Sequence, residues 1–266
     1  MPTIHEIYEY LNQKAPVAYK MDFDNPGFLV GDGAWETKRV LLALDITDWV
    51  VEEAVEKGAG LIVSHHPLFF GLKSVSGQEP LGARAVRMIE NRVAGVCMHT
   101  NLDAVKDGVN DALALALGLA EIGPLEESGR DANGDYYGIG RVGTLPGCGE
   151  TPLKDFLPWV KKALKANGLR YHDAGKPVRK VAVVGGAGAD YMSQALALGC
   201  DTFVTSDVKY DPFLNAKHLG LNLIDADHFC TENVVLPVLD RWLKEAFPTL
   251  EVLTSETHGQ TAQFFV

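Results

Sequence analysis

Histidine and carboxylate side chains follow three strand-like runs of this sequence, where each run ends. Ser64-His65-His66-Pro67 comes directly after one apolar run, and His99-Thr100-Asn101-Leu102-Asp103 follows a second. The third run ends in Asp225-Ala226-Asp227-His228-Phe229-Cys230-Thr231-Glu232. In open α/β sheets, ligands gather at the carboxyl ends of the strands. The three strand ends together therefore predict a metal centre.

The spacing of these residues favours two ions rather than one. Neighbouring residues on a strand point to opposite faces, so His65 and His66 serve two adjacent ions unless the chain turns at Pro67. His228 and Glu232 share one helix face if a helix begins at His228, whereas Thr231 is the N-cap if the helix begins later. A carboxylate such as that of Asp103 can bridge two ions ~3.5–4 Å apart. Mixed imidazole and carboxylate ligands suit Zn²⁺, Mn²⁺, Fe²⁺ or Ni²⁺ better than Ca²⁺ or Mg²⁺.

Other polar residues of the sequence do not belong to such clusters of histidine and carboxylate. We expect four further histidines to be structural or surface residues: His5, His172, His218 and His258. Cys230 points away from the predicted site on helical spacing, and Asp207 and Lys209 are as well explained by a solvated loop as by a site. The glycine-rich segment 185–190 lacks the third glycine of a dinucleotide-binding loop, and loop flexibility accounts for it better.

The two halves of the chain repeat one order of elements. Strand, helix, glycine stop and strand occupy residues 39–63 and recur at residues 180–204, with Gly58 matching Gly199. Each half reads as a βαβ module with parallel strands. We therefore predict an α/β fold of two similar lobes, residues 1–125 and 126–266, with the metal site between them. We also expect the last residues, 261–266, to form a closing strand.

Composition limits the functional classes. The 266 residues carry a formal net charge of −11, which argues against a protein that coats nucleic acid through its overall field. No apolar run approaches the ~20 residues of a membrane span, and residues 1–20 do not resemble a signal peptide. The four cysteines form no CxxC pair, as in a reduced protein. A cytoplasmic location follows as an expectation.

The motifs resemble those of the GTP cyclohydrolase 1 type 2 homologues, also described as dinuclear metal centre, hexameric proteins. Besides the three strand-end motifs, the resemblance includes the opening turn 24–31 and Thr205-Ser206-Asp207-Val208-Lys209-Tyr210. It implies two α/β lobes, a toroidal hexamer and a dinuclear centre. The metal ligands that it implies are His65, His66, Asp103, His228 and Glu232. The chain departs from the family pattern at Ser206 and Asp227, where glycine is frequent, and at Asp211, where histidine is frequent.

The resemblance and the residues together predict a metal-dependent hydrolase. In GTP cyclohydrolase chemistry, water attacks C8 of the guanine ring and formate is released, and His99 could carry the proton. The substrate would be a small molecule such as a nucleotide. Two alternatives remain open: a metal-dependent phosphoesterase, and a toroidal metal-binding assembly or regulatory protein without turnover.

Overall fold

The computed structural model describes residues 1–147 and 151–265, so Cys148 and Val266 lie outside the described residues. The chain folds into two compact units. Unit 1 comprises residues 1–105 and 236–259, and unit 2 comprises residues 106–235 and 260–266. The predicted boundary after residue 125 therefore differs from the observed division. The chain returns to unit 1 because β13 (Glu251–Thr254) pairs with β2 (Arg39–Ala43) in parallel.

Unit 1 is built on a five-stranded sheet of order β1-β4-β3-β2-β13. Its remaining strands are β1 (Gly27–Val30), β3 (Leu61–Ser64) and β4 (Ala94–Cys97). Strands β2, β3 and β4 run parallel, and β1 is antiparallel to β4. Because parallel strands end at one edge of the sheet, the residues that follow β2, β3 and β4 meet there.

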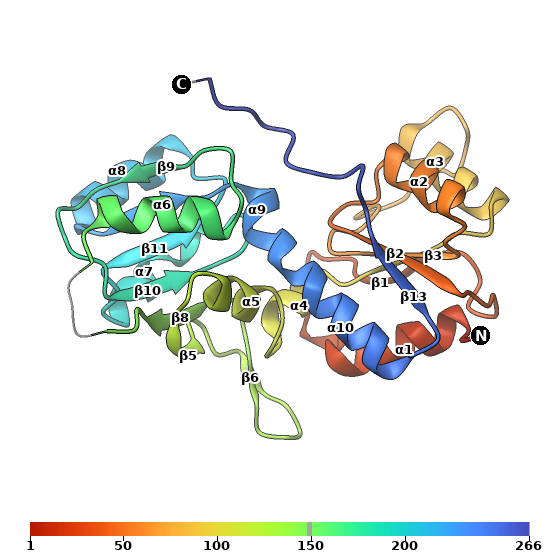
Figure 1. Cartoon of the computed structure of the whole chain (residues 1–266), viewed down its shortest axis with the longest axis horizontal. Coiled ribbons are helices and arrows are strands. Elements are labelled where there is room, and N and C mark those ends of the chain that lie inside the picture. Colours follow the sequence, from red (N-terminus) through yellow and green to blue (C-terminus); the bar gives the residue numbers. More distant parts are fainter. Residues whose placement is uncertain (148–150, 266) are drawn as a thin grey trace. The chain divides into compact units, whose positions relative to one another are not determined.

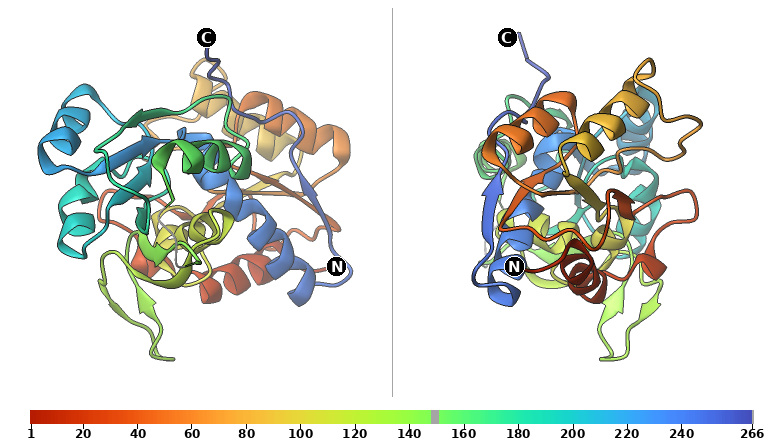
Figure 2. Two further views of the ribbon diagram at one scale, coloured as in Figure 1. Left: turned by 60° about the vertical axis from the view of Figure 1, so that its left-hand side comes forward. Right: turned by 90° about the vertical axis from the view of Figure 1, so that its right-hand side faces the viewer.

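Helices cover both faces of the unit 1 sheet. Figures 1 and 2 show α2 (Asp48–Lys57) and α3 (Pro80–Glu90) on one face, and α1 (Ile4–Lys14) and α10 (Leu236–Ala246) on the other. The unit also contains η1 (Val17–Tyr19) and the short α4 (Thr100–Ala104). Gly58 ends α2 in the left-handed conformation, as its predicted stop position requires. Pro237 lies in the first turn of α10, where a proline is tolerated because its missing N–H would have no partner within the helix.

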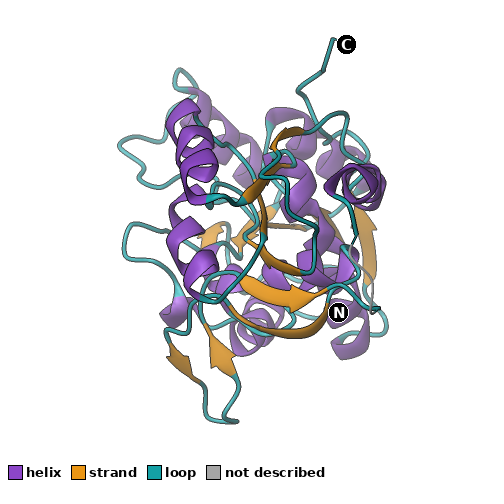
Figure 3. Cartoon of the chain, turned by 90° about the vertical axis from the view of Figure 1, so that its left-hand side faces the viewer, coloured by secondary structure: helices purple, strands orange, loops and turns teal. Residues whose placement is uncertain are grey.

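Unit 2 is built on a six-stranded sheet of order β5-β8-β10-β11-β12-β9. The strands are β5 (Ala120–Pro124), β8 (Arg141–Thr144), β9 (Arg170–His172), β10 (Lys180–Val183), β11 (Thr202–Thr205) and β12 (Asn222–Asp225). Strands β10, β11 and β12 are parallel, whereas β9 and β8 run antiparallel to their neighbours. A small hairpin, β6 (Gly129–Arg130) and β7 (Tyr136–Tyr137), protrudes from this unit (Figure 3).

The core of unit 2 lies between the sheet and two helices, α5 (Val109–Ala116) and α6 (Leu153–Ala163). The crossovers between the parallel strands contain η2 (Ala189–Tyr191), α7 (Met192–Ala197) and α8 (Tyr210–Leu219). After β12 the chain forms α9 (His228–Glu232) and η3 (Asn233–Val235). The mixed α/β fold is thus as predicted.

The predicted closing strand at 261–266 is wrong for its described part, residues 261–265, which belong to no strand. This segment is held instead by hydrogen bonds in which Asn167 contacts Gln260 and Ala262, and the Phe264 ring covers Gly168. Its apolar residues therefore pack locally and leave Phe265 exposed, rather than joining a sheet. None of the helices among the described residues has the length and apolar character needed to cross a membrane.

Candidate metal centre

Three imidazole rings meet at the carboxyl edge of the unit 1 sheet. His65 and His66 follow β3, and His99 follows β4. Their ring centroids lie 5.0 Å (His65–His66), 5.1 Å (His65–His99) and 5.4 Å (His66–His99) apart. One nitrogen of each ring lies within 4.8 Å of the others, which is close enough for a shared metal site. The chain turn expected at Pro67 thus brings both neighbouring histidines into one cluster.

Each of these rings is oriented by an oxygen that can only accept a hydrogen bond. His65 Nδ1 lies 2.9 Å from Met98 O, and His66 Nδ1 lies 2.8 Å from Asp45 Oδ1. His99 Nδ1 lies 2.7 Å from Asp24 Oδ1. Because an ionised carboxylate and a carbonyl have no proton to give, Nδ1 is the donor in all three rings. In the neutral ring the lone pair is therefore on Nε2, the form in which histidine binds a metal ion.

The carboxylate of Asp103 joins this cluster from α4. Asp103 Oδ1 lies 3.6 Å from His65 Nε2, and only 9% of the Asp103 residue is exposed. The short helix is fixed at its start, where Asn101 accepts a hydrogen bond from His99 N and donates one to Ala15 O. Two predicted histidine ligands and one predicted carboxylate ligand therefore lie together in unit 1.

Asp45 was not predicted, and it connects the cluster to a fourth histidine. Its Oδ1 binds His66, and its Oδ2 lies 2.8 Å from His258 Nε2. Burial alone would raise the pKa of Asp45, but the hydrogen bonds from His258 and His66 outweigh it and hold that pKa well below its usual range. Of the structural and surface roles that we expected for His258, the structural one therefore applies. Asp45 could have been found from sequence, since it directly follows the β2 run.

Asp24 orients the His99 ring as Asp45 orients the His66 ring. Burial would raise the pKa of Asp24, but hydrogen bonds from His99 and Thr100 lower it to about 2. The backbone N–H of Thr100 donates to Asp24 Oδ2 over 3.0 Å, which fixes the carboxylate further. Asp24 thus remains ionised at neutral pH and holds the His99 ring in one orientation.

In unit 2, His228 and Glu232 share one face of α9. The helix begins at His228, so the first of the two sequence interpretations is correct, and the N-cap is Asp227 rather than Thr231. His228 Nε2 lies 3.0 Å from Glu232 Oε2, and His228 Nδ1 lies 2.8 Å from Asp207 Oδ2. Asp207, which the sequence explained equally well by a solvated loop or by a site, therefore contacts a predicted ligand. The two remaining predicted ligands thus lie together in this unit.

The glycine-rich loop after β10 provides the space for Glu232. A Cβ on Gly186 would lie 2.2 Å from Glu232 Oε1, and Gly186 has a φ of +65°. The Gly186 N–H also donates to Thr231 Oγ1 over 3.0 Å, which ties the loop to α9. Loop flexibility, our interpretation from sequence, is therefore wrong for this glycine: it is needed because a side chain would displace a buried carboxylate.

Cys230 stays outside the site. It is buried in the core between the sheet, α5 and α6, and burial raises the pKa of its thiol to about 12.

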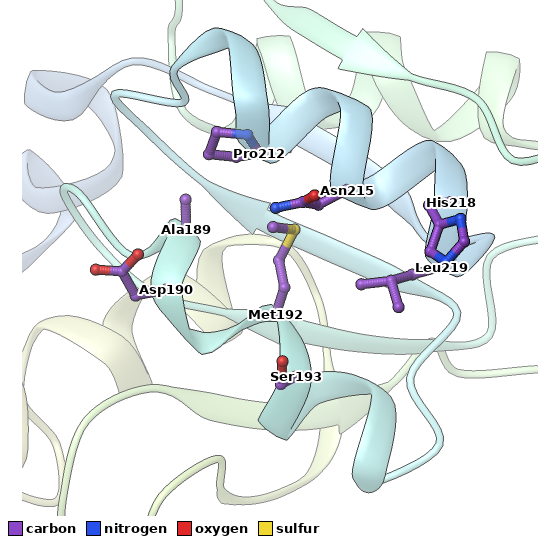
Figure 4. A pocket seen from close by; sticks show the side chains of 8 residues that line it. All are labelled: Ala189, Asp190, Met192, Ser193, Pro212, Asn215, His218 and Leu219. Carbon is purple, nitrogen blue, oxygen red and sulfur yellow. The ribbon is translucent and has the colours of Figure 1, made fainter.

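A cavity of about 300 Å³ lies elsewhere in unit 2, between α7 and α8. Figure 4 shows its one carboxylate, Asp190, and its one imidazole, His218, at opposite ends of the lining. Neither belongs to a group of metal-binding geometry in the part of the chain that the structure describes. His218 accordingly keeps its expected role as a residue outside the metal centre.

Comparison with known proteins identifies the family. The model of the Duf34/NIF3 (NGG1p interacting factor 3) family matches residues 2–260. The chain belongs to the Duf34/NIF3 family. A protein of Clostridium perfringens named GTP cyclohydrolase 1 type 2 homolog is 36% identical over 244 residues, which cover 91% of each chain.

Two solved structures have the same fold as this chain. A Bacillus cereus protein related to NIF3 superposes with a TM-score of 0.92 at 26% identity, covering 100% of this chain and 99% of that one. A hypothetical protein of Staphylococcus aureus gives a TM-score of 0.89 at 29% identity and covers 100% of both chains.

The three departures from the family pattern differ in their position relative to Glu232. Asp227 has a φ of +71°, a conformation that glycine adopts more readily, and it caps α9 through a hydrogen bond from Cys230 N. Ser206 is buried beside the glycine loop, since its N–H donates to Gly186 O over 2.9 Å. Asp211 is exposed in the first turn of α8. Asp227 and Ser206 therefore contact α9 and the glycine loop, the two segments that surround Glu232, whereas Asp211 lies in another helix.

Proposed function

We propose that this protein is a metal-dependent hydrolase with a dinuclear centre. The ions would be Zn²⁺, Mn²⁺, Fe²⁺ or Ni²⁺, held by five side chains: His65, His66, Asp103, His228 and Glu232. The observation that supports this most directly is that the three proposed histidine ligands, His65, His66 and His228, each have Nδ1 within hydrogen-bond distance of a carbonyl or carboxylate oxygen. A histidine that binds a metal ion almost always donates its other ring N–H to a carboxylate or a carbonyl, and in these three residues that arrangement places the lone pair on Nε2.

The donor chemistry fits such ions. Neutral imidazole nitrogens and carboxylate oxygens are the ligands that these transition metals share, and no thiolate of a closed zinc site is present in the set. Divalent ions in a site of this kind supply water activation and stabilise developing negative charge.

The protein's own contribution lies in orientation and proton transfer. Asp45 holds the His66 ring, and Asp207 holds the His228 ring. Asp24 holds His99 with its Nε2 lone pair directed away from Asp24, so His99 can accept a proton at that atom and later return it. We assign His99 this proton-carrying role and not that of a ligand.

The proposed reaction is hydrolysis of a purine nucleotide ring, with water attack at guanine C8 and release of formate. The support is the name of the Clostridium perfringens relative, a GTP cyclohydrolase 1 type 2 homolog, together with the donor set. Hydrolysis of a phosphoester would use the same donors, and the assay below separates the two by product.

We further propose that the two sheets are copies of one module. Sheet order β1-β4-β3-β2 in unit 1 corresponds to β9-β12-β11-β10 in unit 2, with the first strand of each set antiparallel to its neighbour. Each set is followed by a five-residue helix, α4 or α9, that contains a proposed carboxylate ligand. A duplicated strand edge would thus supply donors twice.

The test is turnover of a panel of nucleotides by protein reconstituted with each metal, with formate and inorganic phosphate measured separately. The proposal expects formate from a guanine nucleotide, and no formate from the Glu232→Gln variant. Phosphate without formate would identify a phosphoesterase. Metal binding without either product would favour the assembly interpretation, for which the hexamer implied by the resemblance can be checked by light scattering.

A further inference from the structure

Two exposed phenylalanine rings contact each other, and one of them, Phe70, lies beside His99. Phe23 is 66% exposed and Phe70 is 59% exposed. Their ring centroids are 6.4 Å apart with planes inclined by 42°, and the Phe70 centroid lies 5.9 Å from that of His99. Large apolar rings in water at the edge of a polar cluster are unfavourable for the protein alone, because their burial would be worth free energy.

The backbone on both sides of these rings is firmly held. Asp24, next to Phe23, is buried and bound to His99 and Thr100, and the Asp24 N–H donates to Met21 O over 3.0 Å. Asn25 Nδ2 donates to Phe69 O over 2.9 Å, which ties the loop of Phe23 to the loop of Phe70. The rings are therefore presented from a fixed scaffold rather than from a loose loop, and little ordering is needed on binding.

We propose that Phe23 and Phe70 form a stacking platform that binds a planar purine-type heterocycle next to His99. This proposal rests on the proposed function. It extends that function by assigning the residues that recognise the substrate ring. A flat ring matches the faces of two aromatic side chains in a way that an aliphatic chain does not. A heterocycle also presents polar edge atoms, which a ligand stacked on the phenylalanines beside the His99 imidazole would need.

The experiment measures binding of guanosine and of ribose 5-phosphate to the full-length protein by titration calorimetry. It is done with protein as purified and again after dialysis against a chelator, so that neither turnover nor metal content decides the result. Removing one stacking aromatic typically weakens binding of a base by about tenfold or more. We therefore expect Phe70→Ala and Phe23→Ala to weaken guanosine binding by this factor and to leave ribose 5-phosphate unchanged.

Matched variants separate stacking from other roles. Phe70→Trp should keep guanosine binding, whereas Phe70→Leu, which is apolar but not planar, should lose it. Trp49→Ala removes an aromatic side chain that is 53% exposed on α2 of the same unit and should have no effect.

Three results would overturn the proposal. One is equal binding by Phe70→Leu and Phe70→Trp, and another is wild-type protein that does not bind guanosine. The third is a Phe23→Ser/Phe70→Ser variant that dissociates by light scattering with unchanged guanosine affinity, since the rings would then belong to an interface between copies. Loss of hydrolysis alone, with the binding pattern intact, would instead count against the proposed reaction.

Discussion

The carboxylate of Glu232 fills the space that a side chain at position 186 would take, so this position requires glycine. The Glu232 carboxylate oxygen Oε1 lies 2.2 Å from the point where a Cβ of residue 186 would be. Because the carboxylate is buried and is a proposed ligand, the glycine loop after β10 and the helix after β12 are parts of one donor arrangement.

Replacing Gly186 by alanine should therefore remove metal without unfolding the protein. The added methyl group displaces the Glu232 carboxylate. Because Glu232 is a proposed ligand of one of the two ions, we expect about one ion per chain to be lost. Gly199→Ala is the matched control, because Gly199 also has a positive φ, +75°, but nothing lies within 4 Å of its Cβ position. Both variants bear the ~1 kcal/mol strain of a left-handed alanine. Equal metal content in the two variants, by elemental analysis, would show that the contact is irrelevant.

His258 should act on the metal through Asp45. His258→Phe removes one of the two hydrogen bonds that orient the Asp45 carboxylate, and so loosens the His66 ring. Loss of such a supporting partner typically weakens metal binding by about 10-fold to 100-fold. Competition with a chromophoric chelator measures this, with His5→Phe, at an exposed position of α1, as the control. An unchanged metal affinity would show that His258 only packs in the structure and does not support the metal site.

Glu53 should make the stability of unit 1 depend on pH. Burial would raise the pKa of Glu53, but hydrogen bonds from Glu256 N, Lys57, Ser255 and Thr257 lower it to about 2. Since the folded pKa is below the unfolded value of 4.5, the stabilisation is complete above pH 4.5 and disappears as pH falls towards 2. Glu53→Gln should cost about 2–3 kcal/mol at pH 7 and progressively less below pH 4.5.

Urea unfolding of metal-free protein between pH 7 and pH 3 measures this difference. Glu52→Gln, whose partner Arg87 is exposed, serves as the control and should change stability little at any pH. A cost of Glu53→Gln that did not vary with pH would contradict the assigned pKa shift.

The parts of the site that could be predicted from sequence are those that local patterns encode. His65, His66, His99 and Asp103 follow apolar strand runs, and the four-residue spacing of His228 and Glu232 fits the observed helix. The missed parts depend on distant contacts: Asp45 and His258 are 213 residues apart in the chain. Such a pair leaves no local periodicity, because only the pairing of β13 with β2 brings the two segments together.

The same reasoning explains the errors in the fold. The apolar residues of the segment 261–265 look like a strand, yet these residues belong to no strand and the Phe264 ring packs on Gly168 instead. The return of residues 236–259 to unit 1 could not be predicted, because the pairing of β13 with β2 joins strands that lie far apart in the sequence.

His99 should affect turnover more than metal content. Its Nδ1 is fixed by Asp24, and we assign its Nε2 to proton transfer. His99→Ala should therefore retain near-normal metal and slow turnover by about 10²-fold, the effect typical of removing a proton-transfer group. Because His99 lies in the same imidazole cluster as His65 and His66, loss of metal in this variant would make it a ligand and contradict the role assigned here.

The central claim is the dinuclear centre, and the metal content of the protein tests it most directly. Protein purified without chelator and reconstituted with Mn²⁺, Fe²⁺ or Zn²⁺ is analysed for bound metal beside its Glu232→Gln variant, which keeps the shape of the side chain but not its charge. The account predicts about two ions per chain in the wild type and about one in the variant, with the fold retained in both. Fewer than about one ion per wild-type chain after reconstitution would contradict it.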